Sequence, residues 1–257
     1  MLAGLFAAAE EYSAERERRV SRSELEAQIS TLPQLGDPYQ TLARADRLKV
    51  IAEIKRASPS RGNLATIEDP AALAIDYESA GASAISVLTE RTGFLGSMDD
   101  LIAVSSSVSI PVLRKDFISN EYQILDARAS GATLVLLILA HLDVEDFLRL
   151  HEFAKSLGLG VLTECHNRDE IEIASDAGAE LIGINTRDLV SFKTDLGLFE
   201  KLSDLLPESA IRVAESSVKS VEDVRRYRAA GADVVLVGEA LVTGDHKRLI
   251  REFVSIS

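Results

Sequence analysis

A short glycine-centred motif recurs four times along this sequence, and its regular spacing limits the possible folds more than any other feature. Each copy reads Ala-Gly-Ala or Ser-Gly-Ala and is followed by a run suited to a strand. The central glycines are Gly81, Gly131, Gly178 and Gly231, at spacings of 50, 47 and 53 residues. Glycine is common in the left-handed position just past a helix, so each copy predicts the end of a helix and the start of a strand. A period of about 50 residues leaves room for two βα units per copy.

Eight short apolar runs along the chain predict strands. They cover residues 49–54, 84–88, 110–113, 133–139, 160–163, 181–184, 211–214 and 233–237. Segments with a helical, charge-bearing pattern follow at residues 69–80, 98–107, 121–130, 144–157, 168–177, 196–205, 220–230 and 247–254. Apolar strands that alternate with helices predict a parallel sheet covered on both faces, and eight such units favour a single (β/α)8 TIM barrel in the α/β class. No Gly-x-Gly-x-x-Gly motif follows the first strand, which disfavours an open dinucleotide-binding sheet.

Residues 1–47 precede the first predicted strand and are expected to form a helical N-terminal extension that caps the bottom of the barrel or enters its top. Residues 48–257 then form the catalytic barrel, and the two parts make one structural domain. Leu2, Leu5, Phe6 and Ala9 share one face of a predicted amphipathic helix. No basic residue precedes this stretch and glutamates follow it, unlike a secretory signal or a transit peptide, so we expect a cytoplasmic protein.

The composition excludes several classes of function. The 28 Lys and Arg against 41 Asp and Glu give a net charge of −13, which disfavours nucleic acid as a partner. A single cysteine, Cys165, excludes disulfides and is expected to pack outside the barrel as a small apolar residue. No apolar run approaches the ~20 residues of a membrane span. The histidines show no ligand spacing and are interpreted as surface residues rather than metal ligands: His141, His151, His166 and His246.

Polar side chains gather where the predicted strands end, which is the working face of such a barrel. They are Glu53, Lys55, Thr89, Glu90, Arg114, Lys115, Asp116, Glu164, Asn185, Arg187, Glu215 and Ser216. Glu53 and Lys55 are two residues apart and so lie on the same side of their strand. An inward charge is costly unless it has a partner, so this pair is interpreted as functional. Glu90, Arg114 and Asp116 fit a solvated rim equally well.

The last two strand ends indicate a phosphate site. Ser217 follows the seventh predicted strand, and Gly238 and Glu239 follow the eighth, each shortly before a helix. Loops at these places in a (β/α)8 barrel commonly bind phosphate through backbone N–H groups, and glycine allows the anion a close approach. Because the net charge of −13 repels anions at long range, local cations such as Lys55 and Arg187 become necessary.

Several of these strand ends stand within longer motifs. The most specific is Ile-Ala-Glu-Ile-Lys-Arg-Ala-Ser-Pro-Ser-Arg-Gly at residues 51–62. Others are Leu-Thr-Glu at 88–90 with Phe94 and Gly96, Pro-Val-Leu-Arg-Lys-Asp-Phe at 111–117, Leu-Leu-Ile at 136–138, Thr-Glu at 163–164, Gly-Ile-Asn-Thr-Arg-Asp-Leu at 183–189, Ala-Glu-Ser at 214–216 and Val-Gly at 237–238. Over essentially the whole chain, these motifs resemble the indole-3-glycerol phosphate synthase family.

The resemblance implies a carboxy-lyase of tryptophan biosynthesis that needs no metal or organic cofactor. Its substrate would be 1-(2-carboxyphenylamino)-1-deoxyribulose 5-phosphate, which is cyclised, decarboxylated and dehydrated to indole-3-glycerol phosphate, CO2 and water. Lys115 would be the general acid that protonates the ribulose carbonyl oxygen, and Glu164 the general base. Lys55 would bind anionic groups and donate a proton during dehydration, while Glu53 would assist proton transfer and hold the lysines. Which lysine serves which step stays open.

The remaining site residues are also implied by the resemblance. Asn185 and Ser216 complete the catalytic set. Substrate-binding residues would be Ser58, Pro59, Phe94, Phe117, Leu136, Arg187, Leu189 and Glu215, with the apolar ones walling the aromatic ring. Ser217, Gly238 and Glu239 would offer backbone N–H groups to the phosphate. The expected partner is this phosphorylated small molecule, with no nucleic acid and no membrane, and the chain is expected to be a monomer or a weak homo-oligomer.

Two features depart from the family pattern. Ser217 stands where the family usually has glycine, and at a positive φ serine would cost about 1 kcal/mol and weaken phosphate binding. The chain also has no tryptophan, whereas some relatives place an N-terminal aromatic over the substrate. We therefore expect the ring pocket to be less closed.

Three other functions fit parts of the pattern. A lysine aldolase would use Lys115 as a Schiff-base nucleophile, but a lysine beside glutamates keeps its charge and suits acid catalysis better. A phosphoribosylanthranilate isomerase would need a cysteine or an aspartate for acid and base chemistry. A phosphometabolite-binding barrel that has lost catalysis would accommodate Ser217, but every catalytic position is filled.

Overall fold

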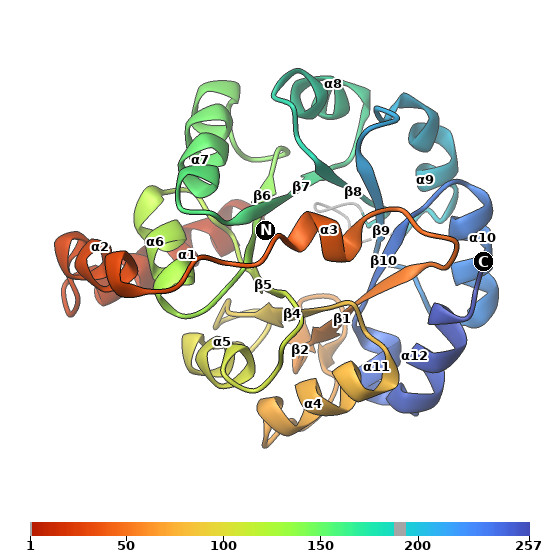
Figure 1. Cartoon of the computed structure of the whole chain (residues 1–257), viewed down its shortest axis with the longest axis horizontal. Helices are drawn as coiled ribbons and strands as arrows, with labels where there is room; N and C mark the ends of the chain where they lie inside the picture. Colours follow the sequence, from red (N-terminus) through yellow and green to blue (C-terminus); the bar gives the residue numbers. More distant parts are fainter. Residues whose placement is uncertain (1, 188–193) are drawn as a thin grey trace.

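Eight parallel strands close into a barrel in the computed structural model, which describes residues 2–187 and 194–257 (Figure 1). Around the barrel the strands follow the order β1-β10-β9-β8-β7-β6-β5-β4. They are β1 (Lys49–Ile54), β4 (Ala84–Leu88), β5 (Val112–Lys115), β6 (Leu134–Ile138), β7 (Gly160–Cys165), β8 (Leu181–Asn185), β9 (Ile211–Glu215) and β10 (Val234–Val237). The predicted (β/α)8 barrel is confirmed.

The third barrel strand begins two residues later than the sequence predicts. The prediction places it at residues 110–113, whereas β5 covers Val112–Lys115. Pro111 has no N–H to donate to a neighbouring strand, so the strand begins after it. Arg114 and Lys115 remain in the strand because each has a carboxylate partner within the fold.

Helices cover the outside of the barrel close to the predicted residues. They are α4 (Pro70–Ala80), α5 (Met98–Ser105), α6 (Glu121–Ala129), α7 (Val144–Ser156), α8 (Arg168–Asp176), α9 (Gly197–Leu202), α10 (Val221–Ala229) and α12 (His246–Val254). The four motif glycines have φ between 68° and 106°, which confirms the left-handed turn at each helix end. Side-chain caps define the starts; Asp69, for example, accepts a hydrogen bond from the N–H of Ala72.

Three short elements are absent from the sequence-based prediction. The strands β2 (Ala57–Ser58) and β3 (Gly62–Asn63) form a hairpin after β1, and α11 (Glu239–Thr243) follows β10 directly. The 3-10 turn η1 (Ser203–Leu205) ends the segment predicted as one helix over residues 196–205. Elements of two to five residues give too short a periodic pattern to stand out in a sequence.

Apolar side chains pack in two layers, one inside the barrel and one between the strands and the helices. Cys165 lies buried in the outer layer, as predicted. Inside the barrel, the apolar residues Ile51, Leu113, Leu162 and Val213 each precede a charged residue by two positions. Because alternate residues of a strand share a face, those charges lie on the inner side at the carboxyl end. They are Glu53, Lys115, Glu164 and Glu215.

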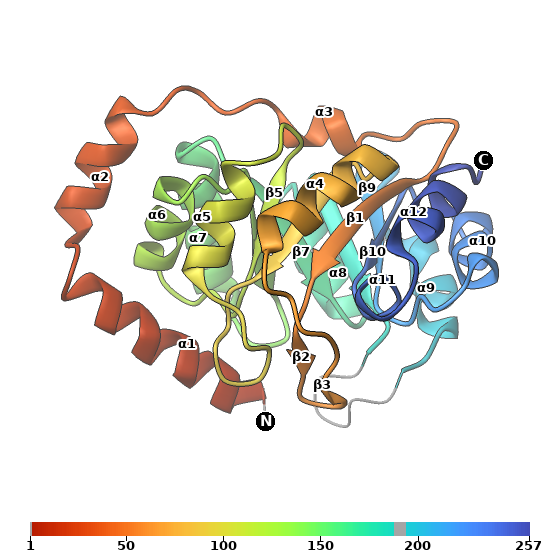
Figure 2. The same ribbon diagram turned by 90° about the horizontal axis from the view of Figure 1, so that it is seen from below.

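The N-terminal extension reaches both ends of the barrel. Its helices are α1 (Leu2–Glu17), α2 (Arg22–Thr31) and α3 (Pro38–Leu42). Figure 2 shows α1 at the end where the β2–β3 hairpin lies and α3 at the opposite end. At the α3 end, the Tyr39 hydroxyl accepts a hydrogen bond from the N–H of Val161, near the start of β7. Of the two expected positions, capping the bottom and entering the top, the extension therefore occupies both.

No helix in the described part of the chain is both long enough and apolar enough to span a membrane.

Candidate active site

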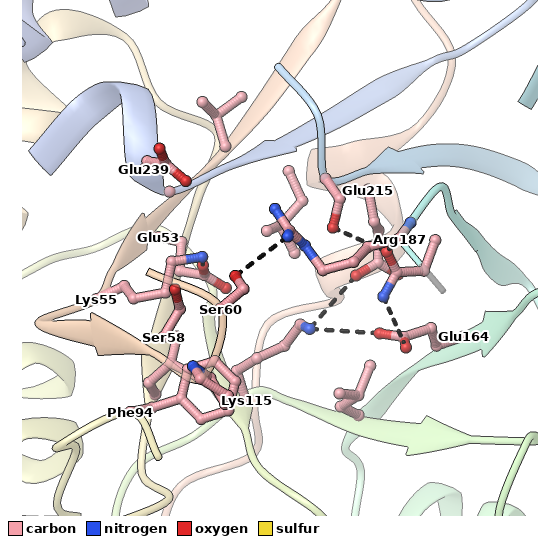
Figure 3. A pocket seen from close by; sticks show the side chains of 18 of the residues that line it. Glu53, Lys55, Ser58, Ser60, Phe94, Lys115, Glu164, Arg187, Glu215 and Glu239 are labelled. Carbon is pink, nitrogen blue, oxygen red and sulfur yellow. Dashed lines mark hydrogen bonds and ion pairs between the residues drawn. The ribbon is translucent and has the colours of Figure 1, made fainter. Parts of the chain in front are cut away.

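A pocket opens at the carboxyl ends of the barrel strands, and it brings together most of the residues that the sequence singles out (Figure 3). Predicted site residues that line it are Glu53, Lys55, Ser58, Pro59, Phe94, Lys115, Phe117, Leu136, Glu164, Asn185, Arg187, Glu215, Ser216, Ser217, Gly238 and Glu239. Leu189 lies outside the residues that the structure describes. Leu2 and Leu5 of α1 also line the pocket.

Lys115 lies between two carboxylates on the pocket floor. Its Nζ is 3.3 Å from Glu164 Oε2 and 3.5 Å from Glu215 Oε2 (Figure 3). Burial alone would lower the pKa of this ammonium, but attraction by Glu164, Glu215 and Glu53 outweighs burial and raises it. Lys115 therefore stays charged at neutral pH and can donate a proton.

Glu164 is a buried carboxylate held by several donors and cations. Its Oε1 accepts a hydrogen bond of 3.0 Å from Asn185 Nδ2, and its Oε2 accepts one from Lys115. Burial would raise the pKa of Glu164, but the positive charges of Lys115 and His166 lower it well below its usual range. Glu164 is therefore ionised and ready to accept a proton.

Glu215 has the opposite character. Its side chain is 1% exposed, and neither carboxylate oxygen has a hydrogen-bond partner among the described residues. Burial and repulsion by Glu164 raise the pKa of Glu215 to about 8, despite the nearby Lys115. A Cβ on Gly183 would lie 2.0 Å from Glu215 Oε1, so only glycine at that position leaves room for this carboxyl.

Glu53 and Lys55 form an ion pair on the opposite side of the pocket, with 2.6 Å between Lys55 Nζ and Glu53 Oε1. The pair explains why the next position along the mouth is Gly238. A Cβ there would lie 2.4 Å from Glu53 Oε1 and 3.0 Å from Lys55 Nζ. The φ of Gly238 is −120°, so the glycine is needed for space rather than for a left-handed backbone.

Asn185 links the base to the loops above it. Its Oδ1 accepts hydrogen bonds from Ser216 Oγ at 2.8 Å and from the N–H of Arg187 at 3.0 Å. The Arg187 guanidinium donates to Ser60 Oγ at 3.3 Å, so the loop after β8 meets the β2–β3 hairpin over the pocket (Figure 3). Asn185 thus orients Glu164 while being held itself.

Ser216 and Ser217 both adopt left-handed backbone conformations, with φ of 69° and 64°. The positive φ considered for Ser217 is therefore present. The Ser217 hydroxyl makes a hydrogen bond of 2.8 Å with Thr186 Oγ1, and Thr186 in turn lies 3.2 Å from the Tyr227 hydroxyl. These contacts offset part of the backbone strain.

Substituting Ser217 separates the strain from the hydrogen bond. Ser217→Gly should be more stable than Ser217→Ala by about 1 kcal/mol, because both lose the hydroxyl and only glycine accepts a positive φ freely. Urea unfolding of the two variants measures this difference. Substrate KM should fall a few-fold in Ser217→Gly if serine weakens phosphate binding, and a KM equal to that of the wild type would contradict that expectation.

An apolar wall closes the side of the pocket next to Lys115. The rings of Phe94 and Phe117 lie 6.1 Å apart, and Phe6 of α1 packs edge-on against Phe117 at 5.3 Å. Leu2 and Leu5 add aliphatic surface from the same helix. In a chain without tryptophan, α1 therefore covers the pocket with leucines and a phenylalanine. The apolar stripe of α1 is visible in the sequence, but its place at the pocket is not.

The interpretation of Glu90, Arg114 and Asp116 as solvated rim residues is wrong, because all three are buried. Arg114 Nη2 donates to Asp116 Oδ2 at 2.8 Å beside the strand that carries Lys115. The Glu90 carboxylate accepts hydrogen bonds from the N–H groups of the loop that carries Phe94. These charges satisfy each other or the backbone and support the site from outside the pocket.

The interpretation of all four histidines as surface residues is also wrong for two of them. His151 is buried beside Phe147 in the helical layer, and His166 is largely buried next to Glu164. Among the described residues, no group of three or more His, Cys, Asp or Glu side chains is arranged to hold a metal ion.

Comparison with known proteins points in the same direction as these residues. A family model described as indole-3-glycerol phosphate synthase matches residues 3–253. A protein of that name from Leifsonia xyli is 54% identical over 257 residues, covering 98% of this chain and 97% of that protein. One from Streptomyces griseus is 52% identical over 235 residues, covering 91% and 87%. Thiamine phosphate pyrophosphorylase from Pyrococcus furiosus, at 15% identity and a TM-score of 0.61 over 81% of this chain and 94% of that one, shares the fold alone.

Proposed function

The chain belongs to the indole-3-glycerol phosphate synthase family, and on that basis we propose how its residues divide the work of the reaction. The enzyme is a carboxy-lyase of tryptophan biosynthesis that acts on a phosphorylated small molecule. It cyclises, decarboxylates and dehydrates 1-(2-carboxyphenylamino)-1-deoxyribulose 5-phosphate to indole-3-glycerol phosphate. The observation that carries the assignment of roles is Lys115, a buried ammonium held between Glu164 and Glu215 beside an apolar wall.

Lys115 acts in ring closure. The ring carbon that bears the carboxylate attacks the ribulose carbonyl carbon, and the electron pair of the carbonyl double bond moves onto oxygen. The Lys115 ammonium donates a proton to that oxygen, which leaves a hydroxyl group and a neutral amine. A fixed cation in a site shielded from water stabilises such a developing charge far better than solvent does.

Decarboxylation follows from the geometry of the wall. Loss of CO2 returns the electron pair of the breaking C–C bond to the ring and restores its aromaticity. Phe94, Phe117 and Leu136 surround the ring with apolar surface, together with Pro59. A carboxylate beside apolar surface is poorly solvated, which favours its conversion to neutral CO2.

Glu164 acts in dehydration, where it removes a proton from the carbon next to the departing hydroxyl. The hydroxyl leaves as water with a proton from Lys55, so a C=C bond forms and the indole is complete. Before the reaction the Lys115 charge holds Glu164 ionised. Once Lys115 has given its proton to the substrate, Glu164 loses that neighbouring charge and its affinity for a proton rises at the step that needs it.

The other predicted residues hold the substrate. Ser217, Gly238 and Glu239 lie at one end of the pocket and bind the phosphate through backbone N–H groups. Lys55 and Arg187 meet the anionic groups, Asn185 and Ser216 orient the reacting atoms together with Ser58 and Glu215, and Leu189 adds to the ring wall. Glu53 holds Lys55 in place through their ion pair.

Two observations count against the alternative enzymes. The raised pKa of Lys115 disfavours the neutral amine that a Schiff-base aldolase needs. Cys165 lies in the layer between strands and helices rather than in the pocket, so it cannot serve as the acid or base of an isomerase.

We also propose a cytoplasmic enzyme that works as a monomer or a weak homo-oligomer, without nucleic acid or membrane as a partner. The net charge of −13 supports the exclusion of nucleic acid.

The proposal is tested by incubating the purified protein with the carboxyphenylamino-deoxyribulose phosphate in the presence of a chelator. Indole fluorescence should rise, with one CO2 and one indole-3-glycerol phosphate formed per substrate consumed. Sodium borohydride added during turnover should trap no substrate on the protein. Covalent trapping at Lys115 would instead support Schiff-base chemistry.

A further inference from the structure

His166 lies directly behind Glu164, between two carboxylates. Its Nδ1 is 3.2 Å from Glu170 Oε2, and its Nε2 is 3.3 Å from Glu164 Oε1. The second contact has the distance of an ion pair without the alignment of a hydrogen bond. The side chain is 14% exposed, so little water screens either contact.

The turn between β7 and α8 fixes this arrangement. Glu170, in the first turn of α8, accepts hydrogen bonds from the backbone N–H of His166 at 2.7 Å and from Asn167 Nδ2 at 2.6 Å. Asn167 is also the N-cap of α8, where its side chain accepts from the N–H of Glu170. The imidazole is therefore held by a carboxylate whose own position is determined by the backbone.

The charges around the ring keep it protonated. Glu164 on β7 and Glu170 on α8 face it directly, and Lys115 on β5 and Glu215 on β9 lie beyond Glu164. Burial lowers the pKa of His166, but the two adjacent carboxylates raise it to about 10. Glu164 thus has a cation on each side, Lys115 toward the pocket and His166 away from it.

We propose that His166, braced by Glu170, is a positioning residue that holds Glu164 by its outer oxygen and keeps it ionised when Lys115 has lost its proton. The inference rests on the proposed role of Glu164 as the base. With Oε1 occupied by His166 and Asn185, Oε2 is the oxygen directed at Lys115 and the reacting atoms. Without His166, nothing positive would remain against Glu164 after ring closure, and the carboxylate would take a proton from solvent before dehydration.

The test is the pH dependence of kcat in His166→Gln, which keeps a polar side chain and removes the charge. The acidic limb of the profile should move to higher pH by about one unit or more, since an adjacent opposite charge lowers a carboxyl pKa by 1–3 units. At pH 6 kcat should fall about tenfold and should recover toward the wild-type value near pH 8, with KM nearly unchanged. His166→Lys, which restores a cation, should return the limb toward its original position.

Two further variants make the result specific. His151→Gln changes another buried histidine, in the helical layer and away from the pocket, and should leave the profile unchanged. Glu170→Gln should make His166 lose its proton at a lower pH, which ring-nitrogen NMR measures without any activity. An acidic limb in His166→Gln that matches the wild type would overturn the inference, as would an equal shift in His151→Gln. If Glu164→Gln turns over normally, it is instead the role of Glu164 that fails.

Discussion

Replacing Lys115 with methionine should lower kcat about 1,000-fold or more while the substrate still binds. Methionine fills a similar volume but cannot donate a proton, and general acid catalysis of this kind contributes about 100- to 10,000-fold. The carbonyl oxygen would then develop its charge with no cation against it. Because the phosphate and the aromatic ring contact other parts of the pocket, the substrate Kd should change by less than about tenfold.

Single-turnover kinetics with a separate binding measurement distinguishes these effects. Lys155→Met, on an exposed helix face where Lys155 pairs with Glu180, is the matched control and should behave as wild type. A circular dichroism spectrum and a urea titration check the fold, since removal of Lys115 leaves Glu164 and Glu215 close together without it. A Lys115→Met enzyme with more than a tenth of the wild-type kcat would rule out Lys115 as the acid.

Replacing Glu164 with glutamine should reduce indole formation by about 100- to 10,000-fold, the range expected for loss of a general base. Glutamine keeps the size of the side chain and can still contact Asn185, so the pocket should retain its shape. Because Glu164 acts after ring closure, this variant should still form the carbon–carbon bond and release CO2. Rapid-quench analysis of the first turnover measures each product.

Glu180→Gln is the control for this substitution, because Glu180 is an exposed residue with a surface ion pair. It should leave both products unchanged. A Glu164→Gln enzyme that forms indole at the wild-type rate would show that another group takes the proton.

The barrel could be predicted because its evidence is repeated along the chain. Four glycines at helix ends and eight apolar runs give the same answer many times, so an error at one strand does not change the fold. Pro111 shows where such local evidence fails: its side chain suits an apolar run, while its missing N–H delays the strand to Val112. The inward charges were predictable for the same reason as the barrel, since each follows an apolar inward residue by two positions.

The partners of a charge, by contrast, are set by tertiary contacts that the sequence does not display. Glu90, Arg114 and Asp116 occupy strand ends just as Lys115 does, yet they bind one another or the backbone outside the pocket. His166 has no motif of its own, because its neighbours Glu164 and Glu170 become significant only when the turn after β7 brings them to its ring. The position of α1 is equally hidden, since an apolar stripe predicts burial but not the surface that buries it.

The division of work between Lys115 and Glu164 is tested most directly by recording CO2 release and indole fluorescence in one reaction for both variants. Lys115→Met should produce neither signal at the wild-type rate, because ring closure precedes both. Glu164→Gln should release about one CO2 per enzyme in the first turnover, with indole fluorescence delayed or absent. Loss of both signals together in Glu164→Gln, or CO2 release without indole in Lys115→Met, would contradict the assignment of the acid to ring closure and the base to dehydration.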